Sequence, residues 1–114
     1  MKVEADPDAS EWLTDLIDRP RTGNFEWDTG NRSKQAKHGV TPAEVEELFL
    51  GKILFAGRII EPAHDEPRWL LLGATASGRP LALIFTRRGD RLRAISCRPM
   101  RRNERKLYEE ANDA

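Results

Sequence analysis

The chain is poor in the residues that most often carry reaction chemistry or indicate an oxidising compartment. Cys97 is the single cysteine among 114 residues, so no internal disulfide can form and a cytoplasmic location is the default expectation. His38 and His64 are the only histidines, and without further cysteines they do not predict a zinc site. Glycine-rich phosphate loops, G-x-S-x-G and H-E-x-x-H are absent. We therefore expect neither a metal nor a cofactor.

Long apolar runs are missing as well. The runs Trp69 to Leu72 and Leu81 to Phe85 are far too short to cross a bilayer. The opening MKVEADPDAS lacks the apolar middle region of a signal peptide, so we expect no membrane contact. The length fits one domain with a modest core, which three Trp and four Phe help to fill.

Charge is plentiful but unevenly placed. The 19 basic and 19 acidic residues cancel, yet residues 1–23 are mainly acidic and the segment from Leu81 to Tyr108 is rich in arginine. Guanidinium groups concentrated on one hairpin and the following helix favour a phosphate or carboxylate partner. Two alternatives stay open. The charges can form an ordinary salt-bridged surface, or the acidic segment can cover the basic one.

The pattern of apolar residues, caps and breaks predicts an α+β fold. Residues 9–18 have helical spacing with Ser10 as N-cap, and Pro20 to Gly23 form a linker. Thr41 to Glu44 is a capping box that begins another helix. The other expected elements are strands at 25–27, 53–60, 68–74, 81–87 and 91–97, a helix capped by Asp28 and stopped at Gly39, and a last helix from about Met100 through Tyr108. Consecutive strands on short loops imply a small antiparallel meander with the helices packed on one face.

Several of these pieces together resemble the BrnT family of toxins. The resemblance rests on their order and spacing over roughly residues 24–110. The pieces are Phe25-Glu26-Trp27-Asp28, Asn31, Lys34 through Val40, the helix Pro42 to Phe49, Arg68, Gly73, Phe85 to Gly89, Arg93 to Arg98, and Glu104 to Tyr108.

The resemblance implies a RelE-like fold and a ribonuclease that blocks translation as the toxin of a type II toxin–antitoxin pair. It also implies a BrnA-like ribbon-helix-helix antitoxin as partner, RNA as substrate, and operator DNA reached only through the antitoxin. A homodimer and a heterotetramer with the antitoxin both stay open. We expect two parts, an acidic N-terminal helical arm at 1–23 and a BrnT-like domain at 24–114.

Two departures from the family pattern stand out. The acidic arm lies outside the usual domain, and we expect it to pack on the toxin domain of its own chain or of a dimer mate. A small residue, usually alanine, is common at the position of Cys97, and an aromatic hydroxyl is usual at that of Phe85. Cys97 is expected to be a buried spacer.

A ribonuclease that works without metal must deprotonate the 2′-hydroxyl, stabilise the charged transition state and protonate the leaving 5′-oxygen. Arg98 and Arg93 are the catalytic candidates for charge stabilisation, with Arg98 ranked first. Strand alternation places Arg91, Arg93, Ile95 and Cys97 on one face and Arg98 on the other, unless a bulge intervenes. The candidates for binding RNA phosphates are Arg68, Arg88, Arg91, Arg102 and Arg105.

Tyr108 and His38 are the candidates for proton transfer. Tyr108 shares a helix face with Arg105 and could also stack on a base, but it can equally pack with Leu107 as a structural residue. His38 precedes Gly39 at a helix C-terminus, where a cation favours the helix dipole. The alternative is that His38 acts as the general base.

The sequence therefore supports two functional hypotheses. The first is a metal-independent endoribonuclease toxin that cleaves through the 2′-hydroxyl. The second is a non-catalytic module whose basic surface holds an antitoxin and supports autoregulatory DNA binding.

Overall fold

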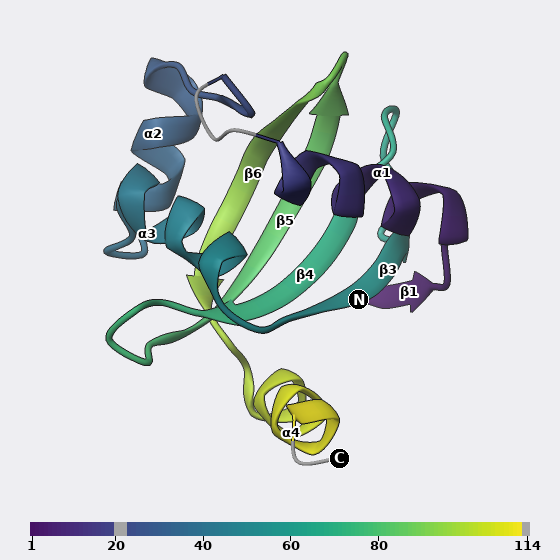
Figure 1. The fold of residues 1–114 in the computed structure, drawn as a ribbon, viewed down its shortest axis with the longest axis vertical. Helices are drawn as coiled ribbons and strands as arrows, with labels where there is room; N and C mark the ends of the chain where they lie inside the picture. Colours follow the sequence, from purple (N-terminus) through teal and green to yellow (C-terminus); the bar gives the residue numbers. More distant parts are fainter. Residues whose placement is uncertain (20–22, 113–114) are drawn as a thin grey trace.

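A six-stranded sheet forms the centre of the computed structural model, which describes residues 1–19 and 23–112 (Figure 1). Its strand order is β1-β3-β4-β5-β6-β2. The run from β3 to β6 is the antiparallel meander that the sequence predicts. The sheet as a whole is mixed, because β2 runs parallel to β6, which corrects the purely antiparallel prediction. The strands are β1 Lys2–Glu4, β2 Phe25–Glu26, β3 Ile53–Glu61, β4 Trp69–Ala74, β5 Pro80–Arg88 and β6 Arg91–Pro99.

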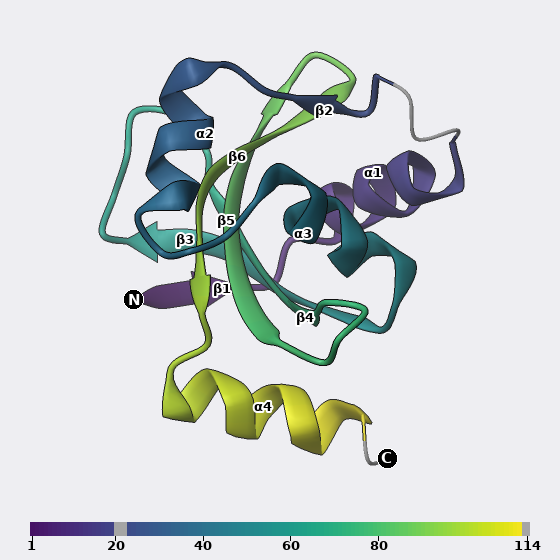
Figure 2. The same ribbon diagram turned by 90° about the vertical axis from the view of Figure 1, so that its left-hand side faces the viewer.

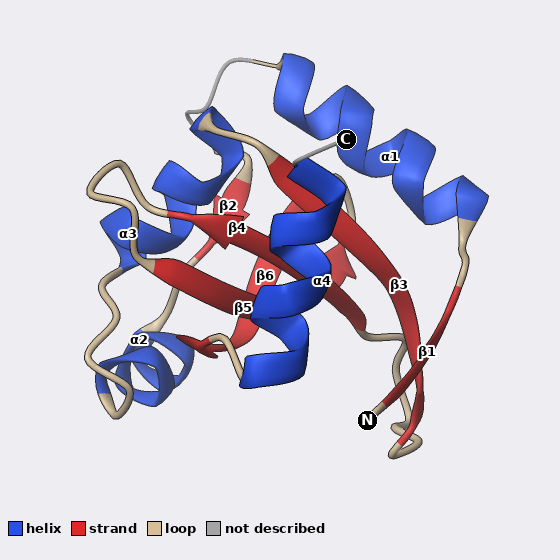
Figure 3. Ribbon diagram, turned by 90° about the horizontal axis from the view of Figure 1, so that it is seen from below, coloured by secondary structure: helices blue, strands red, loops and turns tan. Residues whose placement is uncertain are grey.

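The helices cover both faces of this sheet, and the prediction of helices on one face is wrong for the last of them. Leu71, Leu81 and Leu83 share a buried cluster with residues of α1 and α3. Leu70 and Leu72 belong to a second cluster, against which Tyr108 of α4 packs on the opposite side. We call these sides the α1 face and the α4 face (Figure 3). Both faces of the central strands are apolar, so each needs a cover. The helices are α1 Pro7–Asp18, α2 Thr29–Ala36, α3 Pro42–Glu47 with a short 3-10 turn Leu48–Leu50, and α4 Arg102–Asn112.

Local caps set the helix boundaries. Thr41 and Glu44 form the predicted capping box of α3, and Asp28 forms a second one with Asn31 at the start of α2. Gly39, with φ +68°, occurs in the turn that follows α2, as expected for a helix stop. The predicted N-cap of α1 is wrong: the helix begins at Pro7, and Asp6 accepts a hydrogen bond from the Ala9 amide.

The N-terminal segment shares the sheet and the core with the rest of the chain. β1 pairs with β3 at one edge, and α1 buries Leu13 and Leu16 against the α1 face. The expected packing of this segment on its own chain is therefore confirmed. Gly57 allows the close approach of β1, since a Cβ there would lie 2.2 Å from the Glu4 carbonyl oxygen. The predicted linker, apart from Gly23, lies outside the described residues.

At the other edge of the sheet, α2 lies beside β6 (Figure 2), and its side chains complete the hydrogen bonding of β6 where β2 ends. Asn31 Nδ2 donates to the carbonyl oxygens of Glu26, at 2.9 Å, and of Ala94, at 3.2 Å. Gln35 Oε1 accepts from the amide of Cys97. Both side chains are buried, so polar contacts to a strand edge hold this mostly polar helix in place. None of the helices in the described ranges is long and apolar enough to span a membrane.

Candidate functional site

A bulge in β6 decides which side chains share the α4 face. Ile84 pairs with Ser96, but the next residue, Phe85, pairs with Ala94, so Ile95 is an extra residue in the strand. Leu92, Ala94 and Cys97 therefore all lie in the core of the α1 face. The predicted grouping of Cys97 with the arginines is wrong.

The bulge brings the two catalytic candidates onto one side of the sheet. Arg93 lies between the inward residues Leu92 and Ala94, and Arg98 follows the inward Cys97. Both arginines thus point to the α4 face. The sequence predicted that Arg93 and Arg98 lie on opposite faces, and this prediction is wrong. Strict alternation assumes a strand without a bulge, whereas the extra residue Ile95 shifts the pattern by one.

A basic pocket of about 210 Å³ lies on this face, between the start of α2 and the adjoining ends of β4, β5 and β6. It gathers four cationic side chains from elements far apart in the sequence. Three of them, Arg68, Arg88 and Arg93, are residues that the sequence singles out, and Lys34 of α2 is the fourth. The remaining lining residues are Gly30, Asn31, Ala94 and Ile95. We call this the α2–β6 pocket.

Arg93 is held in place from the sheet edge. Its Nη1 donates to Asp28 Oδ2 at 2.8 Å and to Glu26 Oε1 at 3.0 Å. The hydrogen bond with Asp28 raises the pKa of Arg93, partly opposed by burial, and the same contact lowers the pKa of Asp28. Arg93 is therefore a fixed, permanently charged guanidinium on the pocket wall.

The other two arginines differ in how far they are engaged. Arg88 makes an exposed ion pair with Glu66 at 3.1 Å. The Nε of Arg68 is buried and has no hydrogen-bond partner among the described residues. A buried donor without a partner is unusual in a folded protein.

Lys34 is the residue of this pocket to which sequence reasoning assigned no role. It is an exposed lysine on a mostly polar helix, which by itself gives no signal. It does stand inside the stretch from Lys34 to Val40 that carries the family resemblance. It also lies three residues after the buried Asn31, on the same helix face.

Arg98, the arginine ranked first, lies outside the lining of the pocket and binds Glu104 of α4. Its two terminal nitrogens donate to the two carboxylate oxygens at 2.7 and 2.9 Å, and the Arg101 amide donates to the same carboxylate at 2.7 Å. Burial raises the pKa of Glu104, but these hydrogen bonds outweigh it and the net shift is downward. The hydrogen bonds with Glu104 also raise the pKa of Arg98. The pair fixes α4 to the end of β6.

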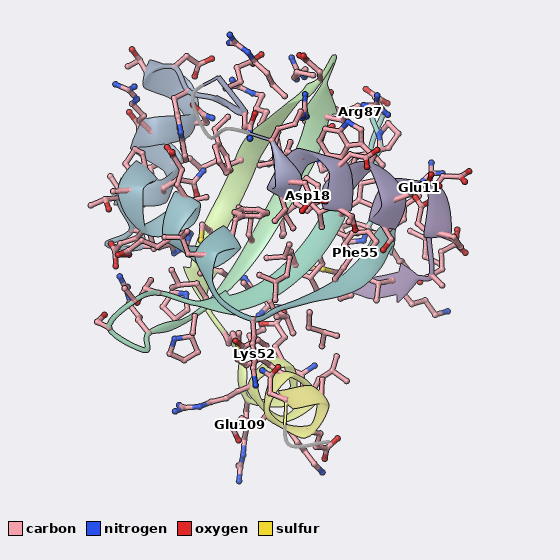
Figure 4. All side chains as sticks on the ribbon, viewed as in Figure 1. Glu11, Asp18, Lys52, Phe55, Arg87 and Glu109 are labelled. Carbon is pink, nitrogen blue, oxygen red and sulfur yellow. The ribbon has the colours of Figure 1, made fainter. Side chains whose placement is uncertain are left out.

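The two proton-transfer candidates also lie away from the lining of the pocket. The Tyr108 hydroxyl donates to the carbonyl oxygen of Lys52 at 2.8 Å. Lys52 lies beside α4 (Figure 4). His38 is exposed in the turn after α2, and its carbonyl oxygen accepts from Arg79 at 3.2 Å. Both residues make hydrogen bonds that join separate parts of the fold, and their catalytic roles stay predictions.

The remaining candidates are solvent-exposed cations. Arg91 lies at the β5–β6 turn, and Arg102 and Arg105 lie on α4, where Arg105 pairs with Glu109. Burial raises the pKa of the Cys97 thiol to about 12, which fits the expected inert spacer. Within residues 1–19 and 23–112, no group of three or more His, Cys, Asp or Glu side chains is arranged to hold a metal ion.

Fold and pocket together define a small α+β protein with a cationic pocket at one edge of a mixed sheet. Comparison with family models then identifies the family within this class. A model of the BrnT family, described as the ribonuclease toxin of type II toxin-antitoxin systems, matches residues 27–104, and the chain belongs to this family. The matched range includes all four cations of the α2–β6 pocket and excludes β1 and α1. No curated protein matches the chain in sequence.

Proposed function

We propose that this chain is an endoribonuclease that binds an RNA phosphodiester in the α2–β6 pocket and cleaves it without a metal ion. The observation that carries the proposal is the convergence of Lys34, Arg68, Arg88 and Arg93 on one small pocket. Membership of a family of ribonuclease toxins supplies the reaction class. The proposal includes the RelE-like fold, the block of translation and a BrnA-like antitoxin as partner.

The pocket suits the charge that develops during phosphodiester cleavage. The 2′-oxygen attacks phosphorus, the bond to the 5′-oxygen breaks, and negative charge accumulates on the non-bridging oxygens. Arg93 is already oriented by two carboxylates, so it can stabilise that charge without reorganising. Arg68 lines the same pocket and adds a second guanidinium charge for the same oxygens. Contacts of this kind typically contribute factors of about 10² to 10³ in rate.

Lys34 is the residue that we assign to the leaving group. Lys34 lies on an exposed helix face at the pocket wall, and an ammonium group can donate a proton whereas a guanidinium stays charged. A donor at this position would protonate the leaving 5′-oxygen, while water takes the proton from the attacking 2′-hydroxyl, and the products are a 2′,3′-cyclic phosphate and a 5′-hydroxyl.

One observation favours the second hypothesis, a non-catalytic module that holds an antitoxin. Neither Tyr108 nor His38 lines the pocket. A basic pocket without a working proton donor would still bind an acidic segment of a partner or an RNA phosphate. Both hypotheses predict that the pocket binds an anion, but only the ribonuclease hypothesis predicts that RNA is cleaved.

The test is cleavage of a short RNA oligonucleotide in excess EDTA, with and without ribosomes. We expect products that end in a 2′,3′-cyclic phosphate and a 5′-hydroxyl. The same oligonucleotide made with 2′-deoxynucleotides should bind but remain uncut, because it lacks the nucleophile. RNA that stays intact in both conditions would favour the non-catalytic module.

A further inference from the structure

The two edges of the sheet are finished differently. At the β6–β2 edge, Asn31 and Gln35 of α2 occupy backbone groups of β6. At the opposite edge β1 is outermost, and in the part of the chain that the structure describes no further strand pairs with it (Figure 1). An uncovered edge strand presents unpaired amides and carbonyls that another strand can use.

Exposed apolar side chains gather beside this edge. Met1, Val3 and Leu107 are 50%, 37% and 49% exposed, and they are three of the large hydrophobic residues that the described chain leaves open to solvent. All three line one groove of about 130 Å³ between β1 and α4, above the buried Leu70 and Leu72. Apolar residues that cluster in this way mark an interaction surface more often than singly scattered ones do.

The sequence of β1 is complementary to itself. In Lys2-Val3-Glu4 a cation and an anion flank an apolar residue. If two such strands pair antiparallel about a two-fold axis at Val3, each Lys2 lies opposite Glu4 of the second copy, and the two valines face each other. Opposite charges in direct cross-strand register stabilise a strand pair. The existing contact of Lys2 with Glu61, at 3.7 Å between highly exposed groups, competes only weakly.

We propose that the β1 edge is a self-association surface whose occupant is a second copy of this chain. The two β1 strands pair across a two-fold axis and join two six-stranded sheets into one continuous sheet. Met1 and Val3 become covered in the process. The family match begins at residue 27, so the strand that forms this surface lies outside the part of the chain that the family model describes.

Two other roles for the β1 edge are distinguished by the test. A short strand with charged side chains can simply protect an edge from pairing, but such protection does not explain why Met1, Val3 and Leu107 are exposed together. An extended segment of an antitoxin could also add to β1. That partner would not depend on the matching of Lys2 with Glu4, whereas a second copy does.

Charge reversal distinguishes these outcomes. Lys2→Glu gives each copy two acidic residues around Val3, and Glu4→Lys gives each copy two basic ones. By sedimentation velocity at low salt, wild type should form a dimer, and each single variant should dimerise at least about 10-fold more weakly. An equimolar mixture of the two variants should recover the dimer, and so should the double variant Lys2→Glu/Glu4→Lys.

Glu11→Lys, a reversal on the exposed side of α1, is the matched control and should leave the dimer intact. Thermal unfolding should show that all variants remain folded. A wild-type protein that is monomeric at every concentration tested would overturn the proposal, as would a dimer that all charge variants form equally well. RNA cleavage by the single variants should equal that of wild type, so this test is independent of the ribonuclease proposal.

Discussion

At the residue scale, Arg98 shows how an arginine can be chosen for the right chemistry and still have a structural role. The sequence places it at the end of the last strand, beside the basic helix, and ranks it first for charge stabilisation. The structure instead gives its guanidinium a bidentate carboxylate partner, Glu104, and leaves only 13% of the Arg98 side chain exposed. This pair directs the Arg98 guanidinium to α4, and Arg98 is not among the residues that line the α2–β6 pocket.

Arg98→Ala alone would not test this role, because it leaves Glu104 buried without its partner and should destabilise the fold by about 3 kcal/mol or more. We predict that Arg98→Met with Glu104→Leu, which removes both charges, stays folded and keeps ribonuclease activity within about 3-fold of wild type. Initial cleavage rates and thermal unfolding measure the two properties. A folded but inactive double variant would return Arg98 to the catalytic machinery.

The residues of the pocket could be predicted only in part. Arg68, Arg88 and Arg93 are recognisable because arginines lie at strand ends within the resembling segments. That they meet depends on the pairing of β4, β5 and β6 and on the bulge at Ile95, for which the sequence carries no local signal. Lys34 could not be assigned, because its importance comes from where α2 packs.

At the element scale, α4 is held by two polar contacts one turn apart. Glu104 binds Arg98 near the start, and the Tyr108 hydroxyl binds the Lys52 carbonyl one turn later. Its amphipathic pattern predicted a packed helix correctly. The face of the sheet that it covers could not be predicted, because Leu70, Leu71 and Leu72 make both faces of β4 apolar.

The anchoring of α4 should depend on pH. The pKa of Glu104 is lowered from its ordinary 4.5 by its hydrogen bonds, with burial opposing. The Glu104 carboxylate therefore contributes its full stability above pH 4.5, and the contribution is lost as pH falls through the lowered pKa. We predict that Glu104→Gln unfolds at a lower temperature than wild type at pH 7 and that the gap narrows below pH 4.5. A constant gap from pH 7 to pH 3 would contradict this.

The elements with strong local signals were the ones that the sequence could locate. The capping box at Thr41 and the four central strands are examples, since caps and alternating apolar runs act within a few residues. β1 was missed, because three residues with one apolar side chain have no periodicity. β2 was expected as a strand, but its parallel pairing with β6 depends on tertiary packing, for which the local sequence gives no signal.

At the scale of the whole molecule, the acidic N-terminal segment and the α2–β6 pocket are on different sides of the sheet. α1 packs on the α1 face, beside Arg87 (Figure 4). There the Arg87 guanidinium lies over the Trp12 ring, 4.9 Å from its centroid, and Asp6 accepts a hydrogen bond from the Trp69 indole at 2.8 Å. The pocket opens on the α4 face. The segment therefore contacts Arg87 through Trp12 but does not cover the cations proposed to bind RNA.

Removal of residues 1–23 should accordingly damage the fold rather than unmask a site. Leu13 and Leu16 are 3% and 1% exposed, and their burial contributes roughly 1.5 to 3 kcal/mol each. This is a large part of the about 5 to 15 kcal/mol that stabilises a typical domain. We predict that the truncated chain unfolds at a much lower urea concentration or is insoluble. Leu16→Ala should show a smaller loss of the same kind. A truncated chain with wild-type stability would show that α1 is dispensable.

The most direct test of the central claim, that the α2–β6 pocket is the site of RNA cleavage, is the single-turnover cleavage rate of Arg68→Ala beside Arg58→Ala, both in EDTA. Arg68 lines the pocket and its Nε has no partner among the described residues, so its removal should cost little stability. Arg58 is exposed on β3 opposite Trp69, whose ring packs on the α1 face, away from the pocket. We predict that Arg68→Ala slows cleavage by about 10²-fold and that Arg58→Ala does not slow it. Equal rates for Arg68→Ala and wild type would contradict the assignment of this pocket.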